Sequence, residues 1–104
     1  MKQNRVLSLV GLATKAGKTV SGEFSTEKAV KTGHAYLVIV SAEASGNTKK
    51  SFCNMTDFYH VPCYCYGSKE ALGRCIGKEF RASLAVTDEN LARAVEKKLK
   101  EHIV

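Results

Sequence analysis

Residues 17–45 decide the fold, and their sequence is GKTVSGEFSTEKAVKTGHAYLVIVSAEAS. An extended piece, residues 19–21, leads to Gly22, and the segment FSTEKAVKTG at 24–33 is typical of a helix of about ten residues that ends at its glycine. Residues 35–44, AYLVIVSAEA, form a continuous apolar run rich in β-branched side chains. Such a run predicts a central strand that is buried on both faces of a sheet.

Two further helices flank this stretch. On the amino-terminal side, apolar residues recur at helical spacing over residues 3–15, and Gly17 falls where a left-handed helix cap belongs. On the other side, Ser45 or Asn47 is the expected start of a helix that Pro62 stops. Phe52, Met55 and Tyr59 are expected to share one face of that helix.

The remaining sequence continues the alternation. We expect a short strand at 63–67, a brief helix that Ser68 caps within 68–77, a strand at 80–87 and a closing helix at 88–103. That helix should turn Leu91, Val95 and Leu99 inward and Lys97, Lys98 and Lys100 outward. Alternation of this kind predicts an α/β fold with helices on both faces of a largely parallel sheet. Because the chain has 104 residues and no linker, we expect a single domain over residues 1–104.

The overall charge favours an anionic partner. Sixteen Lys and Arg residues against ten Asp and Glu give a net charge of +6, and the isoelectric point is near 9.3. A nucleic acid, an acidic protein and a membrane surface all satisfy this composition, as does a basic surface that only aids solubility. The sequence has no targeting signal, and no segment reaches the roughly 20 apolar residues of a membrane span. These features predict a cytoplasmic protein without a membrane partner.

The cysteines do not form a metal motif. Cys53, Cys63, Cys65 and Cys75 have no C-x-x-C spacing, and the histidines flank them in no zinc-ligand pattern. Cys63 and Cys65 lie in an apolar, aromatic run that is typical of a buried strand. We therefore expect buried, reduced thiols and no metal or other cofactor.

The segment Gly17-Lys18-Thr19 resembles a nucleotide-binding P-loop, but its context excludes one. That motif is G-x-x-x-x-G-K-[ST], preceded by a buried strand and followed by a helix. Here Gly11 and Gly17 are separated by one residue too many, a helix precedes Gly17, and an extended segment follows Thr19. The sequence also shows no nucleophile–base arrangement, so we expect neither an enzyme nor a small-molecule substrate.

Gly22 is a better candidate for an anion site. As the residue that opens the second helix, it should leave the next three amides free at the positive end of the helix dipole. These amides suit a phosphate or a base edge, with Lys28 one turn further on and Lys18 on the preceding strand. The alternative is an ordinary helix start in which Glu23 or Ser25 satisfies the amides.

Several motifs together resemble a known family. Residues 17–45, the segment NTKK at 47–50 and CYCYGSKEALGRCIGKEFRASLAVTD at 63–88 are similar to the kink-turn-binding ribosomal proteins of the L-seven-Ae and L-thirty type. The resemblance covers nearly the whole chain and is greatest to the bacterial YlxQ-like branch. It implies a three-layer α/β/α sandwich with a four-stranded mixed sheet, and a protein that recognises sharply bent internal loops of RNA.

The resemblance also implies which residues contact RNA. Around the second helix these are Lys18, Gly22, Glu23, Phe24, Ser25 and Lys28. In the loop that meets an extruded nucleotide they are Leu72, Gly73, Ile76, Gly77, Lys78, Glu79, Phe80 and Arg81. Many RNA-reading relatives carry Asn-Glu where this chain has Phe24-Ser25, and Phe24 has no group that hydrogen-bonds a guanine edge. Phe80 is expected either to stack on a base or to be the first core residue of the last strand.

The combined prediction is a non-enzymatic, ribosome-associated protein that binds structured RNA, with ribosomal proteins as further partners. The alternative is a protein–protein interaction or assembly module of the same fold with only general RNA affinity. The exposed aromatic residue at a helix start favours this alternative, because such a side chain can anchor a protein partner.

Overall fold

A computed structural model describes residues 4–103, and side chains up to residue 101. The elements are α1 (Arg5–Lys15), β1 (Thr19–Ser21), α2 (Glu23–Lys31), β2 (Leu37–Val40), α3 (Gly46–Phe58), β3 (Cys63–Cys65), α4 (Lys69–Cys75), β4 (Ser83–Val86) and α5 (Glu89–Ile103). The predicted order of helices and strands is confirmed. The predicted helix start at residue 3 lies outside the described residues.

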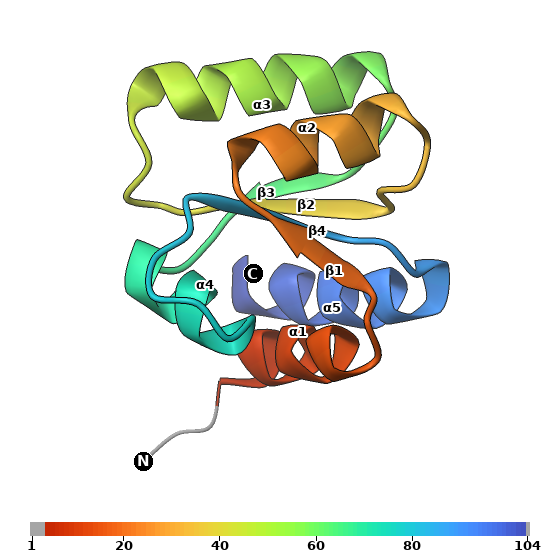
Figure 1. Ribbon diagram of the computed structural model, residues 1–104, viewed down its shortest axis with the longest axis vertical. Helices are drawn as coiled ribbons and strands as arrows, with labels where there is room; N and C mark the ends of the chain where they lie inside the picture. Colours follow the sequence, from red (N-terminus) through yellow and green to blue (C-terminus); the bar gives the residue numbers. More distant parts are fainter. Residues whose placement is uncertain (1–3, 104) are drawn as a thin grey trace.

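Three layers make up the molecule. Helices α2 and α3 cover one face of the sheet, and α1, α4 and α5 cover the other (Figure 1). The sheet has four strands in the order β1-β4-β2-β3. This is the three-layer sandwich that the family resemblance implied.

The expectation of a largely parallel sheet is wrong, because β4 runs antiparallel to both of its neighbours and only β2 and β3 are parallel. The chain between β3 and β4 stays at one end of the sheet. Ser41 N donates to Ala82 O at 2.8 Å and Ala42 N donates to Gly67 O at 2.9 Å, which ties this connection to the end of β2. A parallel β4 needs a crossover that returns the chain to the opposite end, and α4 with its loop does not make one.

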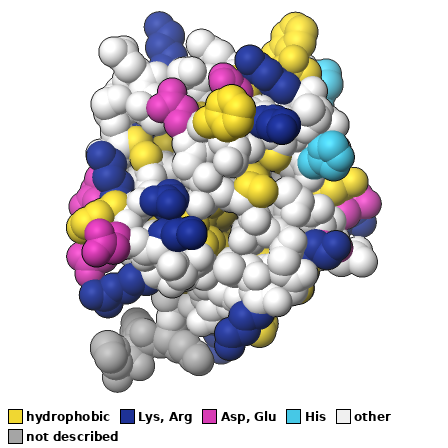
Figure 2. Space-filling view, in the orientation of Figure 1, with side chains coloured by type: hydrophobic (Ala, Val, Ile, Leu, Met, Phe, Trp, Pro, Cys, Tyr) yellow, Lys and Arg dark blue, Asp and Glu magenta, His cyan; other side chains and the backbone are white. Residues whose placement is uncertain are grey.

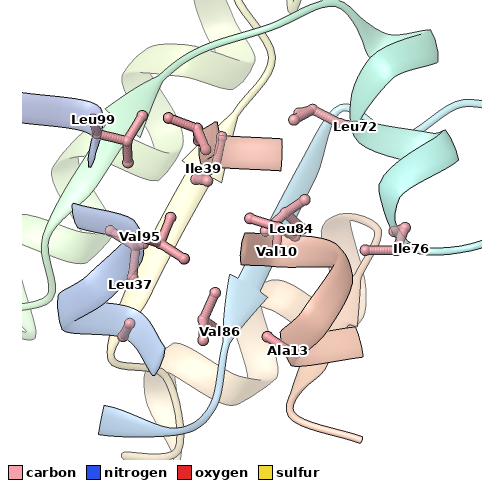
Figure 3. Packing of buried hydrophobic residues seen from close by; sticks show 12 residues of the cluster. Val10, Ala13, Leu37, Ile39, Leu72, Ile76, Leu84, Val86, Val95 and Leu99 are labelled. Carbon is pink, nitrogen blue, oxygen red and sulfur yellow. The ribbon is translucent and has the colours of Figure 1, made fainter. Parts of the chain in front are cut away.

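Alternate residues of the central strands divide between two cores. Leu37 and Ile39 point towards α1, α4 and α5, where Val10 and Val95 are also fully buried (Figure 3). Val38 and Val40 point towards α2 and α3. This explains the continuous apolar run at 35–44, since a strand covered on both faces has no polar side. In α5, Val95 and Leu99 are fully buried and Leu91 packs against the same core, as predicted.

The helix ends explain one sequence signal and correct another. Gly17 has φ of 72° and ends α1, with Lys18 N donating to Ala13 O at 2.8 Å, so this glycine belongs to a helix cap and not to a P-loop. Tyr59 lies outside α3 and does not continue the face that Phe52 and Met55 share. The helix ends at Phe58, and the chain turns at His60, whose φ is 59°, before it reaches Pro62. The Tyr59 ring lies exposed, edge-on to Phe58 at 5.0 Å between centroids.

The prediction of buried cysteines holds only in part. All four are free thiols; Cys63 and Cys75 are half-buried, whereas Cys53 and Cys65 are exposed. Cys65 is exposed because β3 is an edge strand that pairs with β2 alone. Among residues 4–101, no group of three His, Cys, Asp or Glu side chains is arranged to hold a metal ion. No helix in the described range is long and apolar enough to cross a membrane.

Candidate nucleic-acid interface

Gly22 joins β1 to α2 in a conformation that favours glycine. Its φ is 90° and its ψ is 158°, a region that L side chains rarely adopt. Its amide donates to Ser83 O at 3.0 Å, and its carbonyl accepts from Thr26 N, the first bond of α2. The start of α2 is therefore fixed against the start of β4.

The first backbone amides of α2 have no hydrogen-bond partner within the described residues, and we call them bare amides. The other helices begin with a side-chain cap, which is Asn4, Ser45, Ser68 or Asp88. Gly22 provides no such cap, and within residues 4–103 the amides of Glu23, Phe24 and Ser25 donate no hydrogen bond to protein groups, including the Glu23 and Ser25 side chains that were the alternative expectation. We call Gly22 and these three amides the α2 site. It has the geometry and the positive dipole end that bind a phosphate.

Arg81 lies beside the α2 site. Its Nε donates to Ser21 Oγ at 3.0 Å, one residue before Gly22, and its Nη1 donates to Phe80 O at 2.7 Å. Its backbone amide donates to Lys69 O at 3.0 Å. These contacts hold the guanidinium group at Ser21, the residue before Gly22, although Arg81 and Ser21 are 60 positions apart in the sequence.

Gly73 allows the loop of residues 76–82 to pack on α4. A Cβ atom at Gly73 would lie 2.4 Å from Glu79 O and 2.8 Å from Phe80 N, closer than real Cβ contacts allow. Lys78 N donates to Gly73 O at 2.8 Å and closes the turn. We call residues 76–82 the α4–β4 loop. The glycine is therefore needed for the close approach of two backbones.

The sequence-predicted loop residues separate into two groups. Leu72 is fully buried, and Gly73 and Ile76 are buried as well, so these three face the protein interior rather than solvent. Gly77, Lys78, Glu79 and Phe80 are exposed, and Arg81 is half-buried. Only this second group has surface to offer a ligand, while the first group positions it.

Two exposed phenylalanines lie in the α2 site and in the α4–β4 loop. Phe24 is 78% exposed on the first turn of α2, and Phe80 is 59% exposed in the α4–β4 loop. The alternative that Phe80 is the first core residue of the last strand is wrong, because β4 begins only at Ser83. Figure 2 shows hydrophobic side chains lying between Lys and Arg side chains on one face of the molecule. Exposed aromatic rings next to cations are typical of surfaces on which bases stack.

The predicted lysines are not equally close to the α2 site. Lys28 is exposed one turn after the bare amides and makes no ion pair among the described side chains, since neighbouring Glu27 pairs with Lys31 at 3.5 Å. Lys18 lies before the other end of β1, where its carbonyl accepts from Thr87 N at 2.8 Å. Three strand residues separate it from Gly22, so the two residues are roughly 13 Å apart along the chain. Lys18 is therefore at the margin of this surface.

Sequence reasoning missed Ser21 and Ser83, which hold Arg81 and Gly22 in place. Their contacts depend on the pairing of β1 with β4, and no local sequence motif predicts that pairing. Ser21 does precede Gly22 directly, which is the one sequence signal available for it.

Comparisons with known proteins agree with this architecture. The family described as "Ribosomal protein L7Ae/L30e/S12e/Gadd45 family" matches residues 4–98. "RNA-binding protein YlxQ" of Bacillus subtilis is 43% identical over 84 residues, which cover 81% of this chain and 84% of that protein. "Large ribosomal subunit protein eL30" of Sulfolobus acidocaldarius is 32% identical over 84 residues, covering 79% and 81%. The solved structure of the Giardia lamblia 15.5kD RNA binding protein matches with a TM-score of 0.80 and 25% identity, over 95% of this chain and 87% of that one.

Proposed function

The chain belongs to the ribosomal protein L7Ae/L30e/S12e/Gadd45 family, and on this premise we propose that it is an RNA-binding protein whose interface is the α2 site together with the α4–β4 loop. The family and the similar proteins are named for ribosomal and RNA-binding roles and not for enzymatic ones. The net charge of +6 favours the same class of partner.

One observation carries the proposal: Arg81 Nε bonds to Ser21 Oγ, and Ser21 directly precedes Gly22 and the bare amides of α2. Amides at a helix start bind anions through their hydrogens and the helix dipole. A neighbouring arginine adds charge-assisted hydrogen bonds to a phosphate. Both groups are held by the β1–β4 pairing, so little conformational entropy is lost when a ligand binds.

The RNA we propose is a structured internal loop, of the kink-turn kind or similar, in a ribosomal or other structured RNA. Proteins read RNA sequence where bases are splayed out, because the major groove of A-form RNA is too narrow for side chains. Exposed Phe80 offers a stacking surface for such a base, and Lys28 offers a charge for the backbone. We further propose ribosome association, which implies a cytoplasmic location and contacts with ribosomal proteins.

Phe24 and Ser25 limit the selectivity that we propose. Kink-turn-binding relatives that carry Asn-Glu at these positions use both side chains on guanine edges, which a phenyl ring cannot do. Phe24 is exposed, so its ring has no packing role in the core either. We therefore propose that discrimination between kinked and unkinked RNA is weaker than in those relatives.

The alternative function is a protein–protein interaction or assembly module with only general RNA affinity. The exposure of Phe24, 78% at the start of a helix, is the observation that favours it, because aromatic residues of this kind anchor protein interfaces. In that case RNA binding is weak and independent of RNA structure.

A filter-binding titration separates the two functions. The probes are an RNA with tandem G·A pairs beside a three-nucleotide bulge, and a fully paired RNA of equal length. RNA recognition at the proposed interface predicts tighter binding to the bulged RNA and a log–log salt slope of about −3 to −6 if four to six phosphates are contacted. Equal and weak binding to both probes supports the alternative.

Variants then locate the interface. Lys28→Ala combined with Phe80→Ala should weaken binding to the bulged RNA, whereas Lys97→Ala should not. Lys97 is an exposed lysine on α5, on the opposite face of the sheet from α2. If the double variant binds as tightly as the unaltered chain, the site assignment fails.

A further inference from the structure

A groove runs beside α2, on the side of edge strand β1. It has a volume of about 410 Å³ and is lined by Val20, Phe24, Lys28, Thr32, His34 and Thr87, among others. We call it the α2–β1 groove. It begins at the first turn of α2, next to the α2 site, and extends along the helix to its end. The distance from Phe24 to Thr32 along the helix axis is about 12 Å, so the groove is longer than a single base.

The hydrogen bonds at the end of α2 fix the tautomer of His34. The hydroxyl of Thr32 donates to Lys28 O at 2.7 Å, and the same oxygen lies 2.8 Å from His34 Nδ1. A hydroxyl has one hydrogen, and the carbonyl oxygen can only accept it. The bond to His34 therefore has Nδ1–H as donor, and in that tautomer Nε2 is an acceptor.

The polar groups of the groove suit a ribose–phosphate chain. No Asp or Glu lines it. Lys28 makes no ion pair within the described residues, and the neighbouring Glu27 pairs with Lys31 instead. Lys28 offers a cation to a phosphate, and His34 Nε2 offers an acceptor to a hydroxyl. The 2′-hydroxyl group is the donor that distinguishes RNA from DNA.

The apolar part of the groove suits a base. The Phe24 ring is 78% exposed at the entrance, and Val20 forms part of the lining. A base that stacks on an exposed aromatic side chain gains roughly 1–3 kcal/mol, whatever its identity. An aromatic ring, a cation and an acceptor thus follow one another from the first turn of α2 to the residues just after its end.

We propose that the α2–β1 groove holds a short unpaired segment of the RNA strand that leaves the α2 site. In it, a base stacks on Phe24, a phosphate meets Lys28, and a ribose 2′-hydroxyl donates to His34 Nε2. This inference rests on the proposed function, because it extends the RNA path from the α2 site. It gives Phe24 a role that replaces guanine-edge recognition: the ring binds an unpaired base without reading its sequence.

The test uses fluorescence anisotropy with three probes built on the bulged RNA described above. The first is the bulged RNA alone, the second has four unpaired adenosines added after the bulge, and the third has the same four as 2′-deoxynucleotides. The variants are Phe24→Ala and His34→Ala. Lys31→Ala serves as a control, since Lys31 lies on the same helix but does not line the groove. All three variants alter exposed side chains, and thermal melting checks that each is folded.

The unpaired adenosines should strengthen binding to the unaltered chain about fivefold or more. Phe24→Ala should abolish this gain, so that the variant binds the second probe no more tightly than the first. The deoxy probe should bind the unaltered chain a few-fold more weakly than its ribose counterpart, and His34→Ala should remove that difference. Lys31→Ala should behave like the unaltered chain.

Three results overturn the inference. If the bulged RNA binds but the added adenosines give no gain, the groove is not an RNA path, and the proposed function stands. The same holds if the gain survives both Phe24→Ala and His34→Ala. If no probe binds, the proposed function fails and the inference fails with it.

Discussion

Arg81 Nε donates a hydrogen bond to Ser21 Oγ at 3.0 Å, and this contact joins the α4–β4 loop to the residue before Gly22. The loop and the start of α2 come from distant parts of the sequence and meet because β1 pairs with β4. Gly22 N reinforces the junction by donating to Ser83 O at 3.0 Å. The proposed RNA interface is therefore assembled by the sheet. The relative position of the loop and the start of α2 depends on a few polar contacts.

Replacing Arg81 should weaken RNA binding in two ways. Arg81→Ala removes both the charge and the bond to Ser21, and we expect about a tenfold loss of affinity for the bulged RNA. It should also make the salt slope shallower by about 0.7 to 0.9, the contribution of one phosphate contact. Filter binding over a range of salt concentrations measures both quantities.

Ser21→Ala is the matched comparison, because it keeps the arginine but releases its side chain. We expect a smaller loss than for Arg81→Ala and an unchanged salt slope. If Arg81→Ala changes neither affinity nor slope, Arg81 does not contact phosphate.

Gly73→Ala should destabilise the fold. The added methyl group would lie 2.4 Å from Glu79 O, and both groups belong to backbone that packs tightly. Overpacking of this kind costs about 1–3 kcal/mol of unfolding free energy. Urea denaturation measures the change. Gly46→Ala is the control, since a Cβ atom at Gly46 meets nothing within 4 Å, and it should leave stability nearly unchanged. Equal stability of the two variants would contradict the close approach at Gly73.

Alkaline pH should weaken the fold through Tyr64. Burial, together with its hydrogen bond to Glu96 Oε2 at 2.8 Å, raises the pKa of Tyr64 from 10.0 to about 12. The folded state therefore retains a proton that the unfolded state loses, and the resulting stabilisation is complete below pH 10 and falls as pH rises towards 12. Burial raises the pKa of Cys63 and of Cys75 to about 12 and about 11, so these thiols add a decline that starts near pH 9.

Tyr64→Phe isolates the tyrosine contribution. The stability difference between the unaltered chain and this variant should be constant up to pH 10 and should shrink between pH 10 and 12. Urea midpoints across that range provide the measurement. A difference that grows above pH 10 would contradict the assignment.

The four cysteines should react at different rates. Cys53 and Cys65 are exposed, whereas Cys63 and Cys75 are half-buried and their thiols have a raised pKa. Because the thiolate is the reactive form, iodoacetamide at pH 8 should label Cys53 and Cys65 first. Mass spectrometry of peptides at early times gives the order. Faster labelling of Cys63 would show that the half-buried thiols open readily to solvent.

Local signals in the sequence were sufficient for the helices, the buried strand and the glycine that begins α2. They depend on neighbouring residues: Ser45 and Ser68 cap helices as expected, and Gly22 adopts a positive φ. The antiparallel direction of β4 was missed, because it depends on contacts such as Ser41 with Ala82 that join distant segments. The exposure of Cys65 was missed for a related reason, since only the strand order makes β3 an edge.

The candidate site shows the same division. The sequence indicated Gly22, Lys28 and the glycine-containing loop, but it did not distinguish buried Leu72 from exposed Phe80. The tautomer of His34 follows only from the two bonds that meet at the Thr32 hydroxyl, a relationship that the sequence does not display.

The most direct test of the central claim is an NMR titration of the labelled protein with the bulged RNA, following backbone amide shifts. If RNA binds at the α2 site, the largest shifts should fall on the amides of Glu23, Phe24 and Ser25, with a second group at residues 77–81. The amides of α5, on the opposite face of the sheet, should change little. Saturable binding that shifts α5 and leaves the three α2 amides unmoved would contradict the account.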